Sequence, residues 1–335
     1  MKNFDVRKVV RFLMGLSVTF LCLYFISRHV EISEIQIAFI SFDWITLLYG
    51  LACLAVDYLI RVYRWAYILR AMGARITTKE CVGPFLGSIA LNNVLPFRAG
   101  DGVRAFFYPK KMKIKTSMGL SSLMWEKIFD LVVLILMLYV GLIGLGQENL
   151  PKNLERSAWF VVFILLVISI LLFSIQTRYV KSLLTHLESV SNKNLARLGK
   201  YFIQFQKDLA LLYNIRHLSS LMSVSLLVWV TESGIGYFIL RGFGLSVSMT
   251  DALLFMSLVT ISTLVPSSPG YVGPFDLAVI ASASLLGATV GQGVSIALVL
   301  HLTLWFPTTF AGLVAILKDQ TFFREARIEL QNDNK

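Results

Sequence analysis

Charged side chains lie within or beside the apolar stretches of this chain, where a bilayer makes them costly. Arg98, Asp101 and Arg104 follow one apolar run, and Glu126 and Asp130 lie early in the next. An Arg or Asp at the bilayer centre costs about 2.5 to 3.5 kcal/mol even on lenient insertion scales, so such residues usually have a role. Because Glu126 and Asp130 are four residues apart, they share one helical face and are predicted to pair with the two arginines.

Two interpretations of this cluster stay open. In the first, fixed ion pairs lock the segment around Arg98 to the following helix near the cytoplasmic interface. In the second, Arg98 or Arg104 exchanges a protein carboxylate for a lipid phosphate, because a guanidinium matches phosphate oxygens in a bidentate fork. Free backbone N–H groups around Gly100 and Gly102, near a helix start, would add donors for the same anion. Both interpretations can hold in turn during a transport cycle.

Polar residues elsewhere in the apolar runs have their own interpretations. Glu232 lies within a span and has no basic residue near it in sequence, so it is either a protonated core carboxyl or a group that couples transport to a proton or cation. Asp57 and Arg61, four residues apart, are predicted to pair on a helix surface near the membrane interface. His301 in the last span is expected to be a satisfied polar core residue rather than a proton relay.

Two Pro- and Gly-broken apolar segments would position the charged residues. Pro96 and Gly100 recur as Pro266 and Gly270 at one offset of 170 residues (266 − 96 = 270 − 100). Paired broken helices of this kind mark substrate sites in transporters. The residues predicted to shape the breaks are Pro96, Gly100, Gly102, Pro266, Pro269, Gly270 and Gly273. The candidate substrate-binding residues are Arg98, Asp101, Arg104, Glu126, Asp130 and Asp276.

The composition places the chain in a membrane. Hydrophobic residues make up 56% of the 335 residues, charged residues make up 15%, and the mean hydropathy is +0.70. A water-soluble core could not use so much apolar surface, so the bilayer must be the solvent. The net charge of +11 comes from basic residues in short loops between apolar runs, where they set topology and contact anionic headgroups. We find no basic, aromatic-rich soluble module of the kind that binds nucleic acid.

Several reaction classes lack their motifs. The sequence has no P-loop, so ATP-driven transport by this chain alone is not expected. It has no HExxH motif, no cysteine cluster for zinc and no GxSxG elbow. Cys22, Cys53 and Cys81 are expected to be small core residues. We therefore predict no cofactor, no metal site and no catalytic residue.

The expected fold is an all-α polytopic membrane protein with about six full spans and two re-entrant hairpins. The predicted spans are Val9–Ser27, Trp44–Leu59, Met118–Leu145, Trp159–Phe173, Leu218–Leu240 and Val294–Leu317. The apolar pieces Cys81–Phe97 and Ala252–Leu286 are predicted to enter from opposite faces as re-entrant hairpins arranged in inverted repeats. Basic loops place both termini in the cytoplasm. If both arms of each hairpin cross instead, the chain has eight or more full spans with the same cytoplasmic termini.

Residues 1–335 are interpreted as a single membrane domain with two repeat-like halves. The first half covers residues 1–145 and the second covers residues 218–318. Residues 157–217 form a connecting span and a cytoplasmic segment in which apolar residues recur at roughly helical spacing, which predicts amphipathic helices on the membrane surface. Residues 319–335 are a charged cytoplasmic tail.

Three ordered motifs carry a family resemblance. The segments PFRAGDGVR, WEKIFD and PGYVGPFD follow the pattern P-x-R-x-G-E-x-x-R, then E-K/R-x-x-D, then P-G-x-x-G-x-x-E. The matching residues are Pro96, Arg98, Gly100, Arg104, Glu126, Asp130, Pro269, Gly270 and Gly273. Asp101 and Asp276 stand where glutamate is usual, which keeps the charge but shortens its reach. The chain thus resembles, over nearly its whole length, the lysylphosphatidylglycerol synthase transmembrane family of flippase-like membrane proteins.

The resemblance implies lipid translocation more strongly than lipid synthesis. In the multiple peptide resistance factor, a similar membrane flippase domain is joined to a soluble synthase domain, which we do not expect here. The implied function is a lipid flippase that moves a phospholipid, an aminoacyl-phospholipid or a polyprenyl-phosphate-linked lipid across the cytoplasmic (inner) membrane. Alternatives are a membrane transferase of the phosphatidylglycerol lysyltransferase type, with Glu126 or Asp101 as base, and an accessory scaffold for an envelope-lipid enzyme.

The same interpretation sets the expected partners. A membrane lipid with an anionic headgroup is expected to bind, and an envelope-lipid enzyme and a second copy of the chain are further candidates. Nucleic acid is not expected.

Overall fold

The computed structural model is all-helical in the part of the chain that it describes. That part comprises residues 17, 19–22, 24, 32–95, 98–145, 160, 163, 167, 203–208, 210–212, 214–265 and 269–319. The predicted spans Val9–Ser27 and Trp159–Phe173 and the predicted amphipathic segment lie largely outside these residues, and the tail beyond residue 319 lies wholly outside them.

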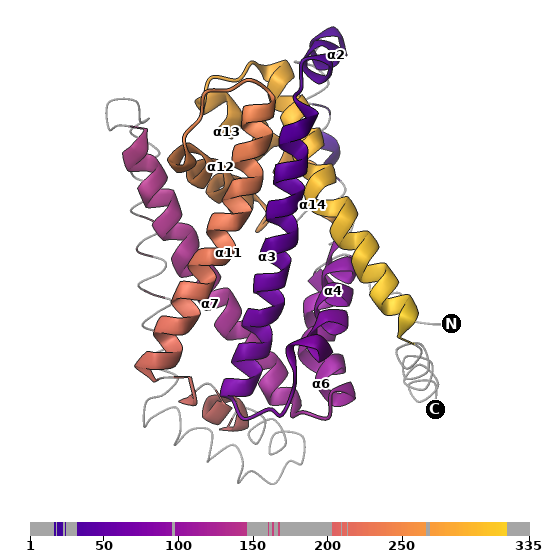
Figure 1. The fold of residues 1–335 in the computed structure, drawn as a ribbon, viewed down its shortest axis with the longest axis vertical. Coiled ribbons are helices and arrows are strands. Elements are labelled where there is room, and N and C mark those ends of the chain that lie inside the picture. The colour runs from indigo at the N-terminus through magenta and orange to yellow at the C-terminus, as the bar shows by residue number, and fades with distance from the viewer. Residues whose placement is uncertain are drawn as a thin grey trace.

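Four long helices form the frame of the molecule (Figure 1). They are α3 (Trp44–Ala71), α7 (Thr116–Gly144), α11 (Ile215–Gly242) and α14 (Val290–Lys318). Each is long and apolar enough to cross a membrane. A helix of 28 residues is about 42 Å long, which exceeds the roughly 30 Å of a hydrocarbon core. These helices coincide with four of the six predicted spans.

Helix α3 is longer than the sequence predicted. The predicted span ends at Leu59, but the helix continues through Arg61 and Arg64 to Ala71. Arg64 is only 1% exposed. A buried arginine is tolerated inside a helix where carboxylates from other helices compensate its charge, and sequence spacing alone does not show such partners.

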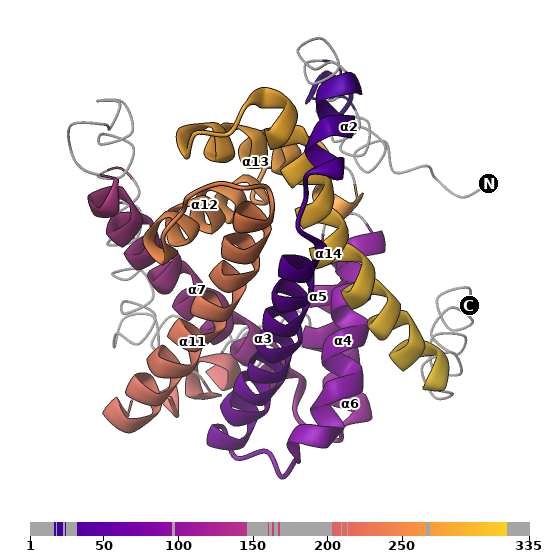
Figure 2. The same ribbon diagram turned by 45° about the horizontal axis from the view of Figure 1, so that its top comes forward.

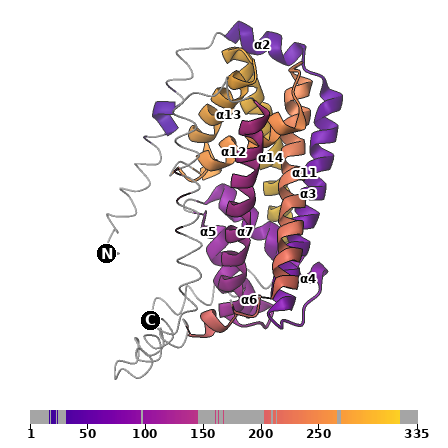
Figure 3. The ribbon, with the colours of Figure 1, turned by 90° about the vertical axis from the view of Figure 1, so that its left-hand side faces the viewer.

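The first broken segment turns back on itself. Helix α4 (Thr78–Val94) begins at a capping box between Thr77 and Glu80, near the end of α3. After a reversal, the chain returns through α5 (Ala99–Gly102), η2 (Val103–Phe107) and α6 (Tyr108–Lys111). Figures 1 and 3 place α6 back at the end of the molecule where α4 starts. We call α4 to α6 the first hairpin.

The second broken segment also turns back, in the other half of the molecule. It consists of α12 (Met249–Ser262), η4 (Pro269–Tyr271) and α13 (Pro274–Leu285), which we call the second hairpin. Figures 1 and 3 show α12 and α13 toward the end opposite to α6, where α2 (Ile32–Ile40) also lies. Gly270 and Gly273 have φ of 78° and 100°, conformations that side chains with a Cβ rarely adopt.

Close backbone contact explains one glycine of the first hairpin. A Cβ built on Gly100 would lie 1.8 Å from the carbonyl oxygen of Ser88, so α5 can pack against α4 only because this residue has no side chain. Gly102 has an ordinary helical φ of −62° and open space around its Cβ position. The packing therefore requires glycine at position 100 but not at position 102. The predicted helix-breaking residues Pro96 and Pro266 lie outside the described residues.

Helix α14 packs against both hairpins. At its C-terminal part, a Cβ on Gly312 would lie 2.2 Å from the carbonyl oxygen of Leu86 in α4. Near its start, a Cβ on Gly293 would lie 3.2 Å from Cα of Ile280 in α13. Figure 2 shows α14 extending from the region of α13 to the level of α4. One helix thus holds both hairpins in place around the centre of the molecule.

Candidate functional site

A cavity of about 690 Å³ lies between the two hairpins and the long helices. This size is typical of pockets that enclose small ligands. Nine charged side chains line it: Asp57, Arg61, Arg98, Asp101, Arg104, Glu126, Lys127, Asp130 and Glu232. Five of the six predicted substrate-binding residues are among them, so charges from α3, the first hairpin, α7 and α11 converge on one space.

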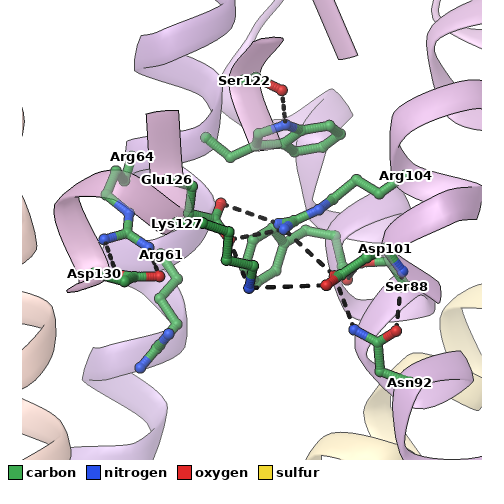
Figure 4. Close-up of polar contacts among 12 residues, drawn as sticks. Arg61, Arg64, Ser88, Asn92, Asp101, Arg104, Ser122, Glu126, Lys127 and Asp130 are labelled. Atoms are coloured by element: carbon green, nitrogen blue, oxygen red, sulfur yellow. Dashed lines mark hydrogen bonds and ion pairs between the residues drawn. The ribbon is translucent and has the colours of Figure 1, made fainter. Parts of the chain in front are cut away.

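Arg104 of the first hairpin is paired with Glu126 of α7, as predicted (Figure 4). Its Nη2 donates to Glu126 Oε1 at 2.7 Å and its Nη1 donates to Oε2 at 3.2 Å. The Arg104 side chain is 1% exposed and lies over the ring of Phe85, 4.7 Å from its centroid. Both terminal nitrogens therefore already have carboxylate partners, in a bidentate geometry that gives strong, directional hydrogen bonds.

The predicted pairing of Asp130 with an arginine of the first hairpin is wrong. Asp130 instead binds Arg64 of α3, with Nη1 to Oδ1 at 2.6 Å and Nη2 to Oδ2 at 3.2 Å. Trp229 Nε1 also donates to Asp130 Oδ1 at 3.2 Å, and Arg64 Nη1 donates to Ser225 Oγ at 3.0 Å. Arg64 lies beyond the end of the predicted span at Leu59, and no spacing in the sequence connects it to Asp130, 66 residues away.

Asp57, Arg61 and Glu232 form a second buried group rather than a surface pair. Arg61 Nε donates to Asp57 Oδ2 at 2.7 Å, and Arg61 Nη2 donates to Glu232 on α11. The predicted pairing of Asp57 with Arg61 is confirmed, but Asp57 is 1% exposed, so its predicted place on a helix surface is wrong. Glu232, which has no basic neighbour in sequence, acquires Arg61 as its partner through the packing of α11 on α3. Two carboxylates here share one guanidinium.

Asp101 is held by Asn92 and approached by Lys127 (Figure 4). Asn92 Nδ2 donates to Asp101 Oδ1 at 2.9 Å, and the Asp101 backbone N–H donates to Asn92 Oδ1 at 2.9 Å. Lys127 Nζ lies 3.8 Å from Asp101 Oδ2 and 4.0 Å from Glu126 Oε1, both beyond hydrogen-bond distance. Its side chain is 44% exposed. Lys127 was not among the predicted site residues, although it stands inside the WEKIFD motif.

Arg98 brings the tips of the two hairpins together. Its guanidinium lies over the ring of Tyr271, with 5.7 Å between Cζ and the ring centroid. Within the described part of the chain, Arg98 has no ion pair. Both residues have positive φ, 52° for Arg98 and 62° for Tyr271. Left-handed conformations are uncommon for residues other than glycine and tend to cluster at functional sites.

Asn93 attaches the end of α4 to α14. Its Nδ2 donates to Thr309 Oγ1 at 2.9 Å and to Thr308 Oγ1 at 3.2 Å. Its carbonyl oxygen accepts from Trp305 Nε1 at 3.4 Å. Several contacts therefore fix the end of α4 just before the reversal, while Arg98 beyond it faces the second hairpin.

Asp276 lies apart from this cluster, in the first turn of α13. Its Oδ2 accepts the backbone N–H of Gly273 at 2.9 Å, and its Oδ1 lies 3.0 Å from Nδ1 of His301 on α14. Asp276 thus pairs with a histidine rather than with an arginine. His301 lines the cavity and stacks edge-on against Phe275. The expectation that His301 has a polar partner is confirmed by this contact.

The arrangement defines a class of protein: an all-helical bundle whose long apolar helices surround a charged internal cavity, as in membrane proteins that handle polar cargo. A family model described as the lysylphosphatidylglycerol synthase TM region matches residues 12–312. The chain belongs to this family, and the resemblance predicted from its motifs is confirmed. It is therefore a multi-pass membrane protein.

Two relatives extend the comparison. The chain is 22% identical over 240 residues to the UPF0104 membrane protein MJ1078 of Methanocaldococcus jannaschii, an alignment that covers 71% of this chain and 98% of the relative. It is 29% identical over 140 residues to the glycosyltransferase AglD of Haloferax volcanii. That second match covers 42% of this chain but only 22% of the relative, so most of the glycosyltransferase has no counterpart in the match.

Proposed function

We propose that the protein is a lipid flippase that binds the phosphate of a lipid headgroup between its two hairpins and moves that lipid across the cytoplasmic membrane. The observation that carries the proposal is a pair of cavity-lining cations, Arg98 and Lys127, with only weak internal partners. Arg98 has a ring contact with Tyr271, and Lys127 has carboxylates at 3.8 Å and 4.0 Å. A phosphate oxygen can replace such partners at small cost.

Arg104 is a weaker candidate for phosphate than its sequence motif suggested. To bind a phosphate, Arg104 would have to leave Glu126, and breaking a buried ion pair in this way costs about 3 to 5 kcal/mol. We therefore assign phosphate contact to Arg98 and Lys127. Arg104, Glu126 and Asp130 hold the wall of the site, and Asp101 orients Lys127.

The architecture that we propose for transport is a pair of opposed re-entrant hairpins in two inverted repeats. Helix α4 has 17 residues and α12 has 14, so they extend about 26 Å and 21 Å, less than a hydrocarbon core. The proposed halves are residues 1–145 and 218–318, joined by residues 157–217. Basic loops support cytoplasmic termini, with the tail from residue 319 on the same side. In this arrangement, the substrate site lies between the hairpins, near the bilayer midplane.

Three lipid classes fit a phosphate-binding site of this kind: phospholipids, aminoacyl-phospholipids and polyprenyl-phosphate-linked lipids. The relative that is named a glycosyltransferase supports keeping sugar-linked lipids among the candidates. The transferase alternative needs a free carboxylate as base, but Glu126 is held by Arg104 and Asp101 by Asn92. These contacts favour transport over group transfer.

The test is lipid movement in proteoliposomes with headgroup-labelled phosphatidylglycerol and a membrane-impermeant quencher. Wild type is compared with Arg98→Ala, Lys127→Ala and the control Lys79→Ala, which removes an exposed lysine at the start of α4. Each lost charge-assisted contact is worth about 1.5 to 3 kcal/mol. We therefore expect that the two site variants need roughly a ten- to hundredfold higher lipid concentration to reach half of their maximal initial rate. Lys79→Ala should match wild type.

Two results would count against this proposal. If Arg98→Ala and Lys127→Ala proteins insert correctly and move lipid as fast as wild type, the assignment of phosphate contact to Arg98 and Lys127 is wrong. If the wild-type protein leaves the inner leaflet protected with phosphatidylglycerol, polyprenyl phosphate and aminoacylated lipid alike, the proposed transport function is wrong.

A further inference from the structure

The pair formed by Asp276 and His301 joins the second hairpin to α14 beside the hairpin tip. Asp276 is the only charged residue from residue 269 to residue 285. Its two carboxylate oxygens have different partners: Oδ2 accepts the backbone N–H of Gly273 at 2.9 Å, and Oδ1 lies 3.0 Å from His301 Nδ1. The side chains are 15% and 18% exposed, so solvent protons can reach the pair.

We propose that the Asp276–His301 pair is a proton-binding site that controls the contact between the two hairpin tips. This site is separate from the proposed phosphate contacts Arg98 and Lys127. The inference rests on the proposed function only where it gives the tip movement a role in lipid transport. Ionisable residues within membrane bundles commonly form proton relays in transporters. A histidine paired with a carboxylate is well suited to this role, because histidine ordinarily changes charge between pH 5 and pH 8.

The protonation step follows from the hydrogen bonds. An ionised carboxylate only accepts hydrogen bonds, so with Asp276 ionised the proton of the neutral imidazole lies on Nδ1 of His301. His301 Nε2 is then the free base, and it takes up one proton from water. The net charge of the pair changes from −1 to 0, and the proton leaves again when the pH rises.

The change in charge acts on Arg98. With the pair at −1, the tip of the second hairpin attracts the guanidinium that lies over Tyr271. With the proton bound, that attraction is lost, and the contact of the guanidinium with the Tyr271 ring remains. Tyr271 has φ of 62° and Gly273 has φ of 100°, so two left-handed residues lie between the ring that Arg98 contacts and Asp276. We therefore expect the tips to separate when the pair binds a proton.

Other titratable groups face the same region and must be distinguished from the pair. Cys22 of the N-terminal segment lies beside Gly273, and Tyr58 of α3 lines the cavity with His301, but thiols and phenols ordinarily titrate above pH 8. Arg61 stays charged throughout. Several carboxyls also line the cavity: Arg61 holds Asp57 and Glu232, Asn92 holds Asp101, Arg104 holds Glu126 and Arg64 holds Asp130. Glu232, on the facing helix α11, serves as the matched control.

The experiment measures the distance between the tips directly, without any lipid assay. Spin labels are placed on the full-length chain at Leu95→Cys, beside the first tip, and Leu264→Cys, beside the second, after Cys22, Cys53 and Cys81 are replaced by alanine. Leu95 and Leu264 are 39% and 66% exposed, so both can carry a label. Pulsed electron resonance then gives the label-to-label distance between pH 8 and pH 5.

We expect the distance distribution to move to longer values when the pH falls from 8 to 5. The shift should vanish in His301→Gln and persist in Glu232→Gln. In Asp276→Asn the distance should already be long at pH 8, because the pair then starts at a net charge of 0. A distance that does not change with pH in the otherwise unchanged protein overturns the inference. A pH-dependent shift that survives in His301→Gln overturns it as well.

The distance measurement and the proteoliposome lipid assay, taken together, separate this inference from the proposed function. If the distance titrates as expected but no lipid moves, the proton site stands and the flippase proposal fails. If lipid moves and the distance does not titrate, the flippase proposal stands and the proton site fails.

Discussion

The first and second hairpins differ in how many charges they hold and in how those charges are partnered. In the first, Arg104 is buried with both terminal nitrogens on Glu126, and Asp101 and Lys127 lie close by. In the second, Asp251 caps the start of α12, and Asp276 is the single charge near the tip, with a histidine as its partner. Removing one member of the first group leaves a buried charge uncompensated, whereas one proton changes the second. The first hairpin is thus tied to α7 by a buried ion pair, whereas the second is the one that we propose to move.

The largest effect should come from neutralising Glu126. We expect Glu126→Gln to lower the free energy of unfolding by about 3 kcal/mol, because Arg104 keeps its charge in a buried place with only Asp101, 3.8 Å away, to compensate it. Unfolding of the purified protein in detergent with increasing denaturant measures the change. The double variant Arg104→Leu/Glu126→Leu is the control and should recover part of the loss. A Glu126→Gln protein as stable as wild type would show that the first hairpin is not fixed by this pair.

A smaller effect is expected from the packing of the first hairpin. Gly100→Ala should cost about 1 to 3 kcal/mol, since its Cβ would lie 1.8 Å from the Ser88 carbonyl oxygen and force α5 away from α4. Gly102→Ala is the matched control, because its φ is helical and its Cβ would meet nothing within 4 Å. It should be neutral or slightly stabilising. Thermal unfolding of both proteins in detergent tests this, and equal losses would contradict the packing argument.

The smallest effect is expected in the second hairpin. Asp276→Asn keeps an oxygen that can accept the Gly273 N–H, so it should lose only one hydrogen bond, worth about 1 kcal/mol or less. The same denaturant unfolding measures it beside Glu126→Gln, which is the equivalent carboxyl-to-amide change in the first group. If Asp276→Asn destabilises the protein as much as Glu126→Gln does, the two hairpins are equally fixed and the comparison fails.

The sequence was sufficient to predict the helical fold, four long helices and the family. Apolar runs and Pro/Gly breaks are local signals, and so is the spacing of Glu126 and Asp130. The partners of Glu232 and Arg64 were not local. Arg61 and Glu232 are 171 residues apart, and Arg64 and Asp130 are 66 apart. No spacing rule connects such residues, so nothing in the sequence indicated that α3 could continue past Leu59 with two arginines in its core-facing part.

Lys127 shows a second limit of sequence reasoning. It stands in a charged motif beside Glu126, and helical spacing alone gives it no assigned partner. Its importance comes from tertiary geometry, because it reaches the cavity with its nearest carboxylate oxygens 3.8 Å and 4.0 Å away. A loosely paired charge can be recognised only after the well-paired charges around it have been located.

The packing of α14 against both hairpins has a consequence for the two sides of the membrane. His301 holds the second hairpin, Thr308 and Thr309 hold the first, and Pro307 lies between these attachments. Proline cannot donate the helical hydrogen bond at its position, so the ladder is weakest between the two attachment points. A bend there would displace one hairpin relative to the other. In the transport cycle that we propose, such a bend would couple opening toward one leaflet to closure toward the other, without any additional gate.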